Sequence, residues 1–249
     1  MSPADEAREL VAAAHADPER LEHWLARRLD GEPLAWITGS VVFAGARVRV
    51  LRGVYVPRPQ TEPLVKRAVE LLPTGGLAAD LCTGSGAVAV ALRRARPTAR
   101  VVATDVDPEA CRCAAENDVE IYQGHLGDPI PDALGGSFDV VVAVVPYVPS
   151  EALIYLPSDV QRFEPRRALD GGPGGTVLLE QAVWAGHRLL RPGGSLLLEL
   201  GGDQDDLLTT VLRQAGFDRV RRLADEEGDL RAVEAELRTP QDAAPPHVA

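Results

Sequence analysis

The sequence predicts an α/β protein: a doubly wound, mostly parallel sheet of seven strands, with a small N-terminal helical and hairpin region in front of it. Two observations predict this fold. From Val56 onward, apolar segments of strand length alternate with segments of helical length. A strand, a glycine turn and a helix open that series over residues 77–92. The 249 residues are enough for one large domain with a small addition.

The first 55 residues form the predicted appendage, which is a candidate for substrate recognition. Asp17 followed by Pro18 is typical of a helix N-cap and first helical position. Alternating apolar residues on either side of Gly45 predict a β-hairpin. The helices are expected over 4–14 and 18–29, and the strands over 41–43 and 47–50.

The main domain is expected over 56–238, followed by a disordered tail over 239–249. Arg191-Pro192-Gly193-Gly194 is a typical helix stop, and Gly228 separates two final strands that would form a hairpin and add an antiparallel strand. The expected strands are 77–81, 100–104, 120–123, 138–145, 195–200, 218–223 and 230–237. The expected helices are 61–72, 87–92, 108–117, 176–190 and 204–215.

The turn Asp80-Leu81-Cys82-Thr83-Gly84-Ser85-Gly86 is the most informative stretch of the chain. Its glycines let a ligand approach the backbone, and the helix that follows points its free N–H groups at that ligand. Asp105 ends the next strand, where a βαβ unit holds a carboxylate beside a ribose. The pattern predicts a nucleoside-bearing cofactor, although a plain αβ turn remains the alternative.

Asp80 distinguishes between two such cofactors. Gly84-x-Gly86-x-x-Ala89 also fits the relaxed dinucleotide fingerprint. A carboxylate at the mouth of the turn, however, pairs poorly with a pyrophosphate and well with an ammonium or sulfonium group. S-adenosyl-L-methionine is therefore the predicted cofactor. An NAD-dependent oxidoreductase is disfavoured, because the sequence offers neither a separate substrate domain nor an obvious catalytic base.

Composition and charge exclude several functional classes. The net charge of −11, with no basic stripe, argues against a nucleic-acid partner held through phosphates. No apolar run is long enough to span a membrane. Cys82, Cys111 and Cys113 make neither a disulfide framework nor a zinc quartet, so no metal site is expected and a reducing cytoplasm is the simplest location. A monomer and a homodimer both remain open.

Five motifs give the chain a resemblance that covers nearly its whole length. They are Gly31-Glu32-Pro33-Leu34, Val56-Pro57-Arg58-Pro59-Gln60-Thr61-Glu62, the glycine turn, Pro146-Tyr147-Val148-Pro149, and Phe163-Glu164-Pro165-Arg166-Arg167-Ala168-Leu169-Asp170-Gly171-Gly172. The chain resembles the class I S-adenosylmethionine methyltransferases. More narrowly, it resembles the glutamine-N5 protein methyltransferases that modify peptide-chain release factors. The resemblance implies a Rossmann-like fold.

The resemblance also implies roles for individual residues at the cofactor. Cys82, Thr83, Gly84, Ser85 and Gly86, together with Asp80, would hold the methionine part. Asp105 and Val106 would lie at the ribose, His125 and Leu126 beside the adenine, and Arg58 in a segment that covers the site. His125 stands where the family usually has an aspartate; a neutral imidazole still accepts one hydrogen bond, whereas the imidazolium does not.

The substrate motif departs from the family. Where the family has Asn-Pro-Pro-Tyr, this chain has Val144, Val145, Pro146 and Tyr147, and these four are the candidate catalytic residues. An amide nitrogen is a poor nucleophile, because its lone pair is delocalised into the carbonyl. The family orients it with the Asn oxygen and a backbone carbonyl. Val144 has no acceptor atom, and loss of one such contact typically costs roughly 10²- to 10³-fold in rate.

The sequence thus predicts an S-adenosylmethionine-dependent methyltransferase and leaves three hypotheses for its acceptor. The family default is glutamine in a release-factor-like protein. A more nucleophilic amine, hydroxyl or thiol on a small molecule would not need the missing oxygen of Val144. A non-catalytic cofactor-binding partner protein is the third. The long segment 148–175 is expected to act as a lid, since loops of this length in compact domains are often functional.

Overall fold

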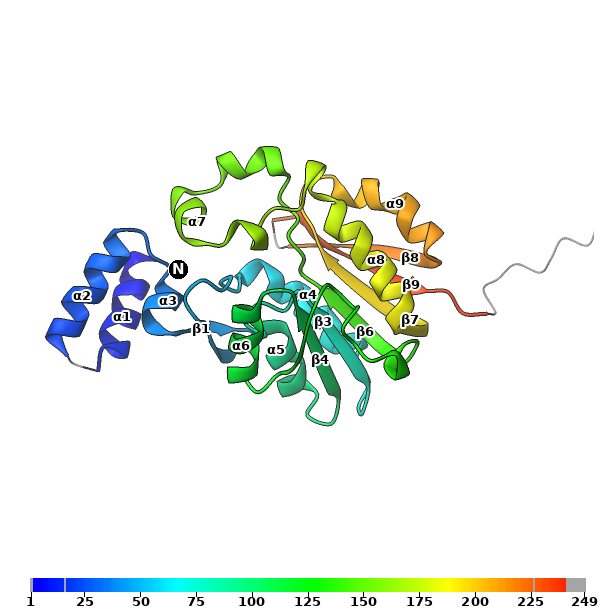
Figure 1. Ribbon diagram of the computed structural model, residues 1–249, viewed down its shortest axis with the longest axis horizontal. Helices are drawn as coiled ribbons and strands as arrows, with labels where there is room; N and C mark the ends of the chain where they lie inside the picture. The colour runs from blue at the N-terminus through cyan, green and yellow to red at the C-terminus, as the bar shows by residue number, and fades with distance from the viewer. Residues whose placement is uncertain (1, 16, 226, 241–249) are drawn as a thin grey trace, which may run out of the picture.

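The structure, a computed structural model, describes residues 2–15, 17–225 and 227–240. Its centre is a seven-stranded sheet in the order β5-β4-β3-β6-β7-β9-β8 (Figure 1). Only β9 runs antiparallel to its neighbours, which confirms the predicted mostly parallel sheet. The strands are β3 (Leu77–Leu81), β4 (Arg100–Asp105), β5 (Glu120–Gln123), β6 (Phe138–Ala143), β7 (Leu190–Glu199), β8 (Phe217–Ala224) and β9 (Leu230–Leu237).

Helices cover both faces of this sheet, as the alternation predicted. The helices α4 (Glu62–Leu71), α5 (Ala87–Ala95) and α6 (Pro108–Glu116) lie on one face, and α8 (Val177–Leu189) and α9 (Gln204–Gln214) on the other. Strand side chains alternate between the two resulting cores. In β3, Ala79 and Leu81 pack with α8 and α9, whereas Ala78 packs with α4 and α5. The sheet is therefore buried on both sides.

The N-terminal region contains two capped helices and a hairpin. The elements are α1 (Pro3–Ala13), α2 (Pro18–Leu29), α3 (Leu34–Thr38), β1 (Ser40–Phe43) and β2 (Ala46–Arg49). Asp17 caps α2 through its side chain, as expected. The hairpin packs on the α5 face of the main domain through Phe43 and Val48. The short helix α3 was not predicted; it buries Trp36, whose indole N–H donates to the Val54 carbonyl at 2.9 Å.

The structure differs from the sequence prediction most clearly at two strand boundaries and in one loop. Strand β6 ends at Ala143, so Val144 and Val145 lie beyond the sheet rather than in it. Strand β7 begins at Leu190, because Leu190 pairs with Phe138 before a register shift, and the expected helix stop lies inside the strand. Segment 148–175 carries a helix, α7 (Ser158–Phe163), and short 3-10 turns. The expected tail lies, from residue 241 on, outside the described residues.

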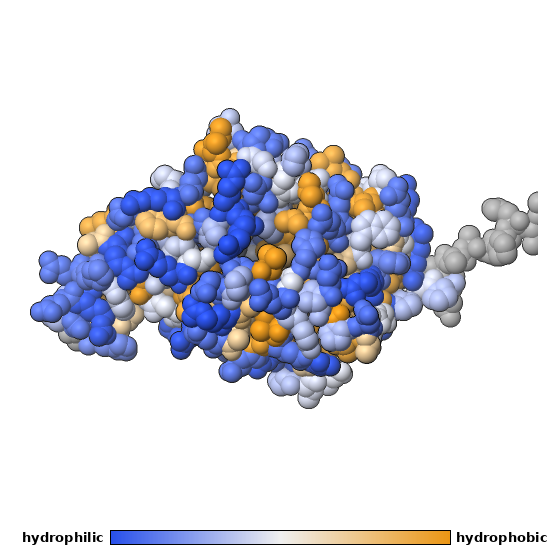
Figure 2. All heavy atoms as spheres, viewed as in Figure 1, coloured by the Kyte–Doolittle hydropathy of each residue, from blue (hydrophilic) through white to orange (hydrophobic). Residues whose placement is uncertain are grey.

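The molecular surface is mostly hydrophilic on the face shown in Figure 2, where the apolar spots stay small and separate. The large apolar side chains that remain exposed include Ile154, Tyr155, Trp184 and Leu207. Within the described part of the chain, no helix is both long enough and apolar enough to cross a bilayer.

Candidate active site

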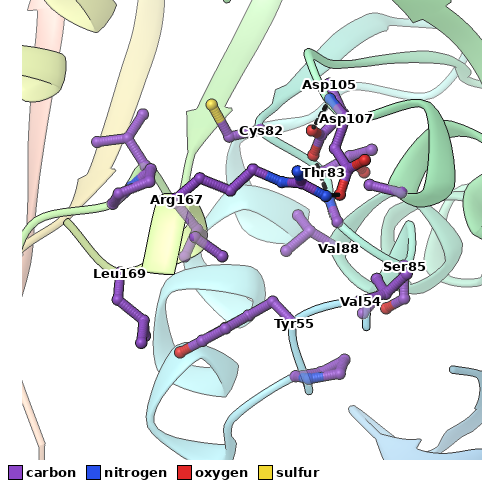
Figure 3. Close-up of a pocket in the computed structure, with 18 of the residues that line it drawn as sticks. Val54, Tyr55, Cys82, Thr83, Ser85, Val88, Asp105, Asp107, Arg167 and Leu169 are labelled. Atoms are coloured by element: carbon purple, nitrogen blue, oxygen red, sulfur yellow. Dashed lines mark hydrogen bonds and ion pairs between the residues drawn. The ribbon is translucent and has the colours of Figure 1, made fainter. Parts of the chain in front are cut away.

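A cavity opens at the carboxyl ends of β3, β4 and β6. Strand β3 begins the sheet in chain order, β4 and β5 follow on one side of it, and β6 returns to the other side. Ligands of open α/β sheets bind at such a point, because the loops on the two sides diverge and leave a crevice. Residues from the β3 turn, the end of β4, the end of β6, the segment before α4 and the 148–175 segment line this cavity (Figure 3).

The turn after β3 is held by Asp80. Its Oδ2 atom accepts hydrogen bonds from the Thr83 hydroxyl at 2.5 Å and from the Ala89 N–H at 3.1 Å. The carboxylate thus ties the turn to the first residues of α5. Gly84 adopts a φ of +57°, a left-handed conformation that glycine takes without strain. Cys82 has a φ of +58° although it is not a glycine, so the turn carries some backbone strain.

The second oxygen of Asp80 has no hydrogen-bond partner among the described residues. The residue is 1% exposed, and Oδ1 is buried without a hydrogen bond among the described residues, as is the nearby Ser85 hydroxyl. Burial raises the pKa of Asp80 to about 7, and the negative charge of Asp105 adds to that effect. A buried carboxylate with a free oxygen at a cavity wall fits a cationic ligand group, which would supply both the missing partner and the opposite charge.

Asp105 lies at the end of β4, across the turn from Asp80. Its two oxygens accept the Gly84 and Asp107 N–H groups, each at 2.9 Å. Each oxygen of a carboxylate keeps a further lone pair, so the side chain can still accept two hydroxyl donors. Burial raises its pKa, while the two N–H groups counteract that effect. The backbone therefore fixes this carboxylate at the cavity wall while each of its oxygens keeps a lone pair for a donor.

Most of the residues predicted from the sequence lie on the cavity wall. They are Arg58, Asp80, Cys82, Thr83, Gly84, Ser85, Asp105, Val106, His125, Leu126, Val144, Val145, Pro146 and Tyr147. Gly86 does not line the cavity. It forms the N-cap of α5 with its back to α6, where a Cβ atom would come within 2.9 Å of Val119 Cγ2. Its lack of a side chain serves helix packing. His125 is exposed, and its Nε2 atom lies 2.8 Å from Gln181 Oε1.

The far end of the cavity is apolar and aromatic. Val144 is half-buried against the α5 core, and Val145 is fully buried in the core on the α8 side. Tyr55 and Tyr147 also line the cavity. The Arg58 guanidinium lies 5.1 Å from the centre of the Tyr55 ring and forms an ion pair with Glu164. Neither side chain of the Val144-Val145 pair can accept a hydrogen bond.

Segment 148–175 forms part of the cavity wall. Pro165, Arg167, Ala168 and Leu169 all contribute to the wall. Figure 3 shows Arg167 reaching across the opening to Asp107, with which it forms an ion pair. The sequence analysis named none of Asp107, Arg167 and Tyr55 as a site residue. Sequence distance explains the omission, since 60 residues separate Arg167 from its partner.

The fold and the site together define a class of protein. A doubly wound sheet with a glycine turn and two buried carboxylates, Asp80 and Asp105, at the switch point of its strand order is typical of the S-adenosylmethionine-dependent methyltransferases. Residues 78–162 match the family described as "Methyltransferase domain". The structure also resembles that of the Mtq2–Trm112 complex of E. cuniculi, with a TM-score of 0.56 and 21% identity over 75% of this chain and 99% of that one.

Two kinds of curated relative are similar in sequence. The release factor glutamine methyltransferase of Moorella thermoacetica is 40% identical over 200 residues, which are 76% of this chain and 69% of that protein. The 4-amino-L-phenylalanine/4-methylamino-L-phenylalanine methyltransferase of Streptomyces pristinaespiralis is 36% identical over 210 residues, 80% of this chain and 71% of that protein. The chain belongs to the release factor glutamine methyltransferase family and is an S-adenosylmethionine-dependent methyltransferase.

Proposed function

We propose that this methyltransferase binds S-adenosylmethionine in the cavity and transfers its methyl group to a small-molecule amine. The free Oδ1 atom of Asp80 would pair with the cationic methionine part, and Asp105 would accept the ribose hydroxyls. Arg58, His125 and Leu126 would complete the wall around the cofactor. These assignments rest on the unpaired carboxylate and on the position of each side chain in the cavity.

The observation that carries the choice of acceptor is Val144. An amide needs two acceptor atoms to hold its N–H groups, and only the backbone carbonyl of Val145 remains for that purpose. An amine keeps its lone pair on nitrogen and needs positioning alone. The aromatic walls contributed by Tyr55 and Tyr147 suit a flat apolar acceptor such as an arylamine. The name of the Streptomyces relative describes an arylamine as the acceptor of that protein.

Glutamine in a release-factor-like protein is the second candidate. It is supported by the names of several relatives that are 34–40% identical to this chain. A cofactor-binding protein without catalysis is the third. All three hypotheses bind the cofactor; they differ in what the protein methylates and in whether it methylates anything.

The test compares acceptors and restores the missing amide. Mass spectrometry after incubation with S-adenosylmethionine would follow methylation of 4-aminophenylalanine, aliphatic amines and a bacterial release factor. We expect amine methylation by the wild type, and we expect Val144→Asn to raise glutamine methylation by about 10²- to 10³-fold. Val148→Asn is the matched control, because Val148 lines the same cavity at another position.

Each remaining outcome selects a hypothesis. If the wild type methylates the release factor as efficiently as Val144→Asn does, glutamine is the acceptor and the proposal is wrong. If calorimetry detects cofactor binding but no amine, alcohol or peptide is methylated, the protein is a non-catalytic partner. If the cofactor does not bind, the assignment of Asp80 and Asp105 is itself wrong.

A further inference from the structure

Tyr147 forms hydrogen bonds with two residues that do not line the cavity, Glu199 and Gln204. Its hydroxyl donates to Glu199 Oε1 at 3.1 Å, and its backbone carbonyl accepts from Gln204 Nε2 at 2.8 Å. Glu199 is the last residue of β7, and Gln204 is the first residue of α9. One strand–turn–helix unit therefore binds both the hydroxyl and the backbone carbonyl of this tyrosine.

Glu199 and Gln204 are both buried, and Gln204 makes further hydrogen bonds. Glu199 is 4% exposed, and its Oε2 atom has no hydrogen-bond partner among the described residues. Gln204 is 6% exposed. Its Oε1 atom accepts the Gly201 N–H at 3.0 Å, and its Nε2 atom also donates to the Gly174 carbonyl at 3.2 Å. Burying two polar side chains is costly unless such bonds are made, so their arrangement is specific.

Two glycines near the end of the 148–175 segment, Gly171 and Gly175, leave room for the backbone of Pro146 and Tyr147 and for the Gln204 side chain. A Cβ atom on Gly175 would lie 2.1 Å from the Tyr147 carbonyl oxygen and 2.4 Å from Gln204 Nε2. A Cβ atom on Gly171 would lie 2.7 Å from the Pro146 carbonyl oxygen. The backbone of Pro146 and Tyr147 is thus enclosed between two glycines and the Gln204 amide.

We propose that Glu199 and Gln204 are positioning residues that fix Tyr147, and with it the Val145 carbonyl, against the methyl acceptor. This inference rests on methyl transfer in the cavity but not on which acceptor is used. A group displaced by about 1 Å typically costs on the order of 10²-fold in rate. Acceptor turnover would therefore depend on two residues that touch neither the acceptor nor the cofactor.

The test uses the full-length protein and whichever acceptor the wild type methylates. We expect Glu199→Leu and Gln204→Leu to lower kcat by about ten- to a hundredfold while the cofactor Kd stays within about twofold of the wild type. Glu199→Gln should keep most activity, because its amide oxygen still accepts the Tyr147 hydroxyl. Asp205→Asn is the matched control: Asp205 is 7% exposed, follows Gln204 in α9 and pairs with Arg222.

A double-mutant cycle separates positioning from general stabilisation. If Glu199 acts through the Tyr147 hydroxyl, Glu199→Leu should add little to the loss that Tyr147→Phe causes alone. Additive losses, equal damage from Glu199→Gln and Glu199→Leu, or an equal loss in Asp205→Asn would each overturn the proposal. Should the leucine variants not fold, Glu199→Gln and its combination with Tyr147→Phe still decide the Glu199 part.

A second readout needs no acceptor, so it also works if the proposed function is wrong. The chain has four tyrosines, so fluorotyrosine labelling gives few ¹⁹F NMR resonances, and Tyr147→Phe identifies the one that belongs to Tyr147. Glu199→Leu and Gln204→Leu should shift or broaden that resonance, whereas Asp205→Asn should not. An unchanged resonance in both leucine variants would show that neither residue holds Tyr147.

Discussion

Replacement of Asp80 by asparagine should make the cofactor-free protein more stable and the cofactor complex weaker. In the structure this carboxylate is buried, and one of its oxygens has no hydrogen-bond partner among the described residues. Burial raises its pKa from 3.8 to about 7. Asparagine has nearly the same shape and keeps the acceptor for the Thr83 hydroxyl, but it never carries the charge.

The sign of the stability effect follows from the raised pKa. Between pH 3.8 and about pH 7 the folded protein keeps a proton on Asp80 that the unfolded chain has lost. The stability from this group is therefore fully present below pH 3.8 and lost as the pH rises toward 7. One pKa unit corresponds to about 1.4 kcal/mol, so the ceiling is roughly 4 kcal/mol. At pH 7.5 we therefore expect the free energy of unfolding of Asp80→Asn to exceed that of the wild type by up to roughly 4 kcal/mol.

Cofactor affinity should depend on pH in the opposite direction. A cationic methionine part binds the ionised carboxylate, so binding below pH 7 must displace the Asp80 proton. For a pKa of about 7, this linkage raises the Kd about 25-fold between pH 7.5 and pH 5.5. The variant Asp80→Asn should bind more weakly than the wild type at pH 7.5 and should show little of this pH dependence.

Two measurements on the same samples test this reasoning. Urea unfolding without cofactor gives the stability difference at pH 5.5 and 7.5, and titration calorimetry with S-adenosylmethionine gives Kd at both values. His125→Gln is the control, because it removes the imidazole from the cavity wall and leaves Asp80 unchanged. A wild-type Kd that is flat with pH, or an Asp80→Asn variant no more stable than the wild type at pH 7.5, would refute the role assigned to Asp80.

Two further predictions concern the 148–175 segment. Arg167→Ala should raise the cofactor Kd by up to about fivefold, because it removes an ion pair to Asp107 across the cavity that is worth at most about 1 kcal/mol at an exposed arginine; an unchanged dissociation rate in stopped-flow measurements would show that the pair does not retain the cofactor. Gly175→Ala should lower the free energy of unfolding by several kcal/mol and suppress turnover, since its Cβ atom would collide with the Tyr147 carbonyl. Gly174→Ala has a positive φ but no neighbour within 4 Å, so it should cost only about 1 to 2 kcal/mol; equal losses in denaturant unfolding would mean that strain, not the collision, decides.

The sequence located the glycine turn that lines the cavity, because the course of that turn depends on short-range order. The turn from Asp80 to Ser85 is one continuous segment whose glycines and apolar flanks determine its course. Asp105 could be placed from the sequence because parallel strands end at the same edge of a sheet. The aromatic and charged residues that close the cavity were harder to predict. Tyr55, Arg167 and Glu199 reach the site only through tertiary packing, and 52 residues separate Glu199 from Tyr147.

The strand boundaries were missed for a related reason. Local propensity favoured continuing the apolar run through Val145, but β6 ends at Ala143, whose partner Leu81 is itself the last residue of β3. The chain then turns away, which brings Val144 to the cavity wall and Val145 into the core. Strand length here is set by the neighbouring strand, a property that one segment does not encode.

A substitution at one end of the cavity is expected to influence the methylation of more acceptors than a substitution at the other end. Under the proposed function, Asp80 and Asp105 would meet the part of the cofactor that every acceptor shares, so we expect a change there to weaken methylation of all acceptors. Val144 lines the same cavity, and its side chain can make no hydrogen bond to the turn or to Asp105. We therefore expect an exchange of valine and asparagine at position 144 to alter the choice of acceptor while the cofactor end stays intact. One cofactor site would in this way serve amides with asparagine at this position and amines with valine.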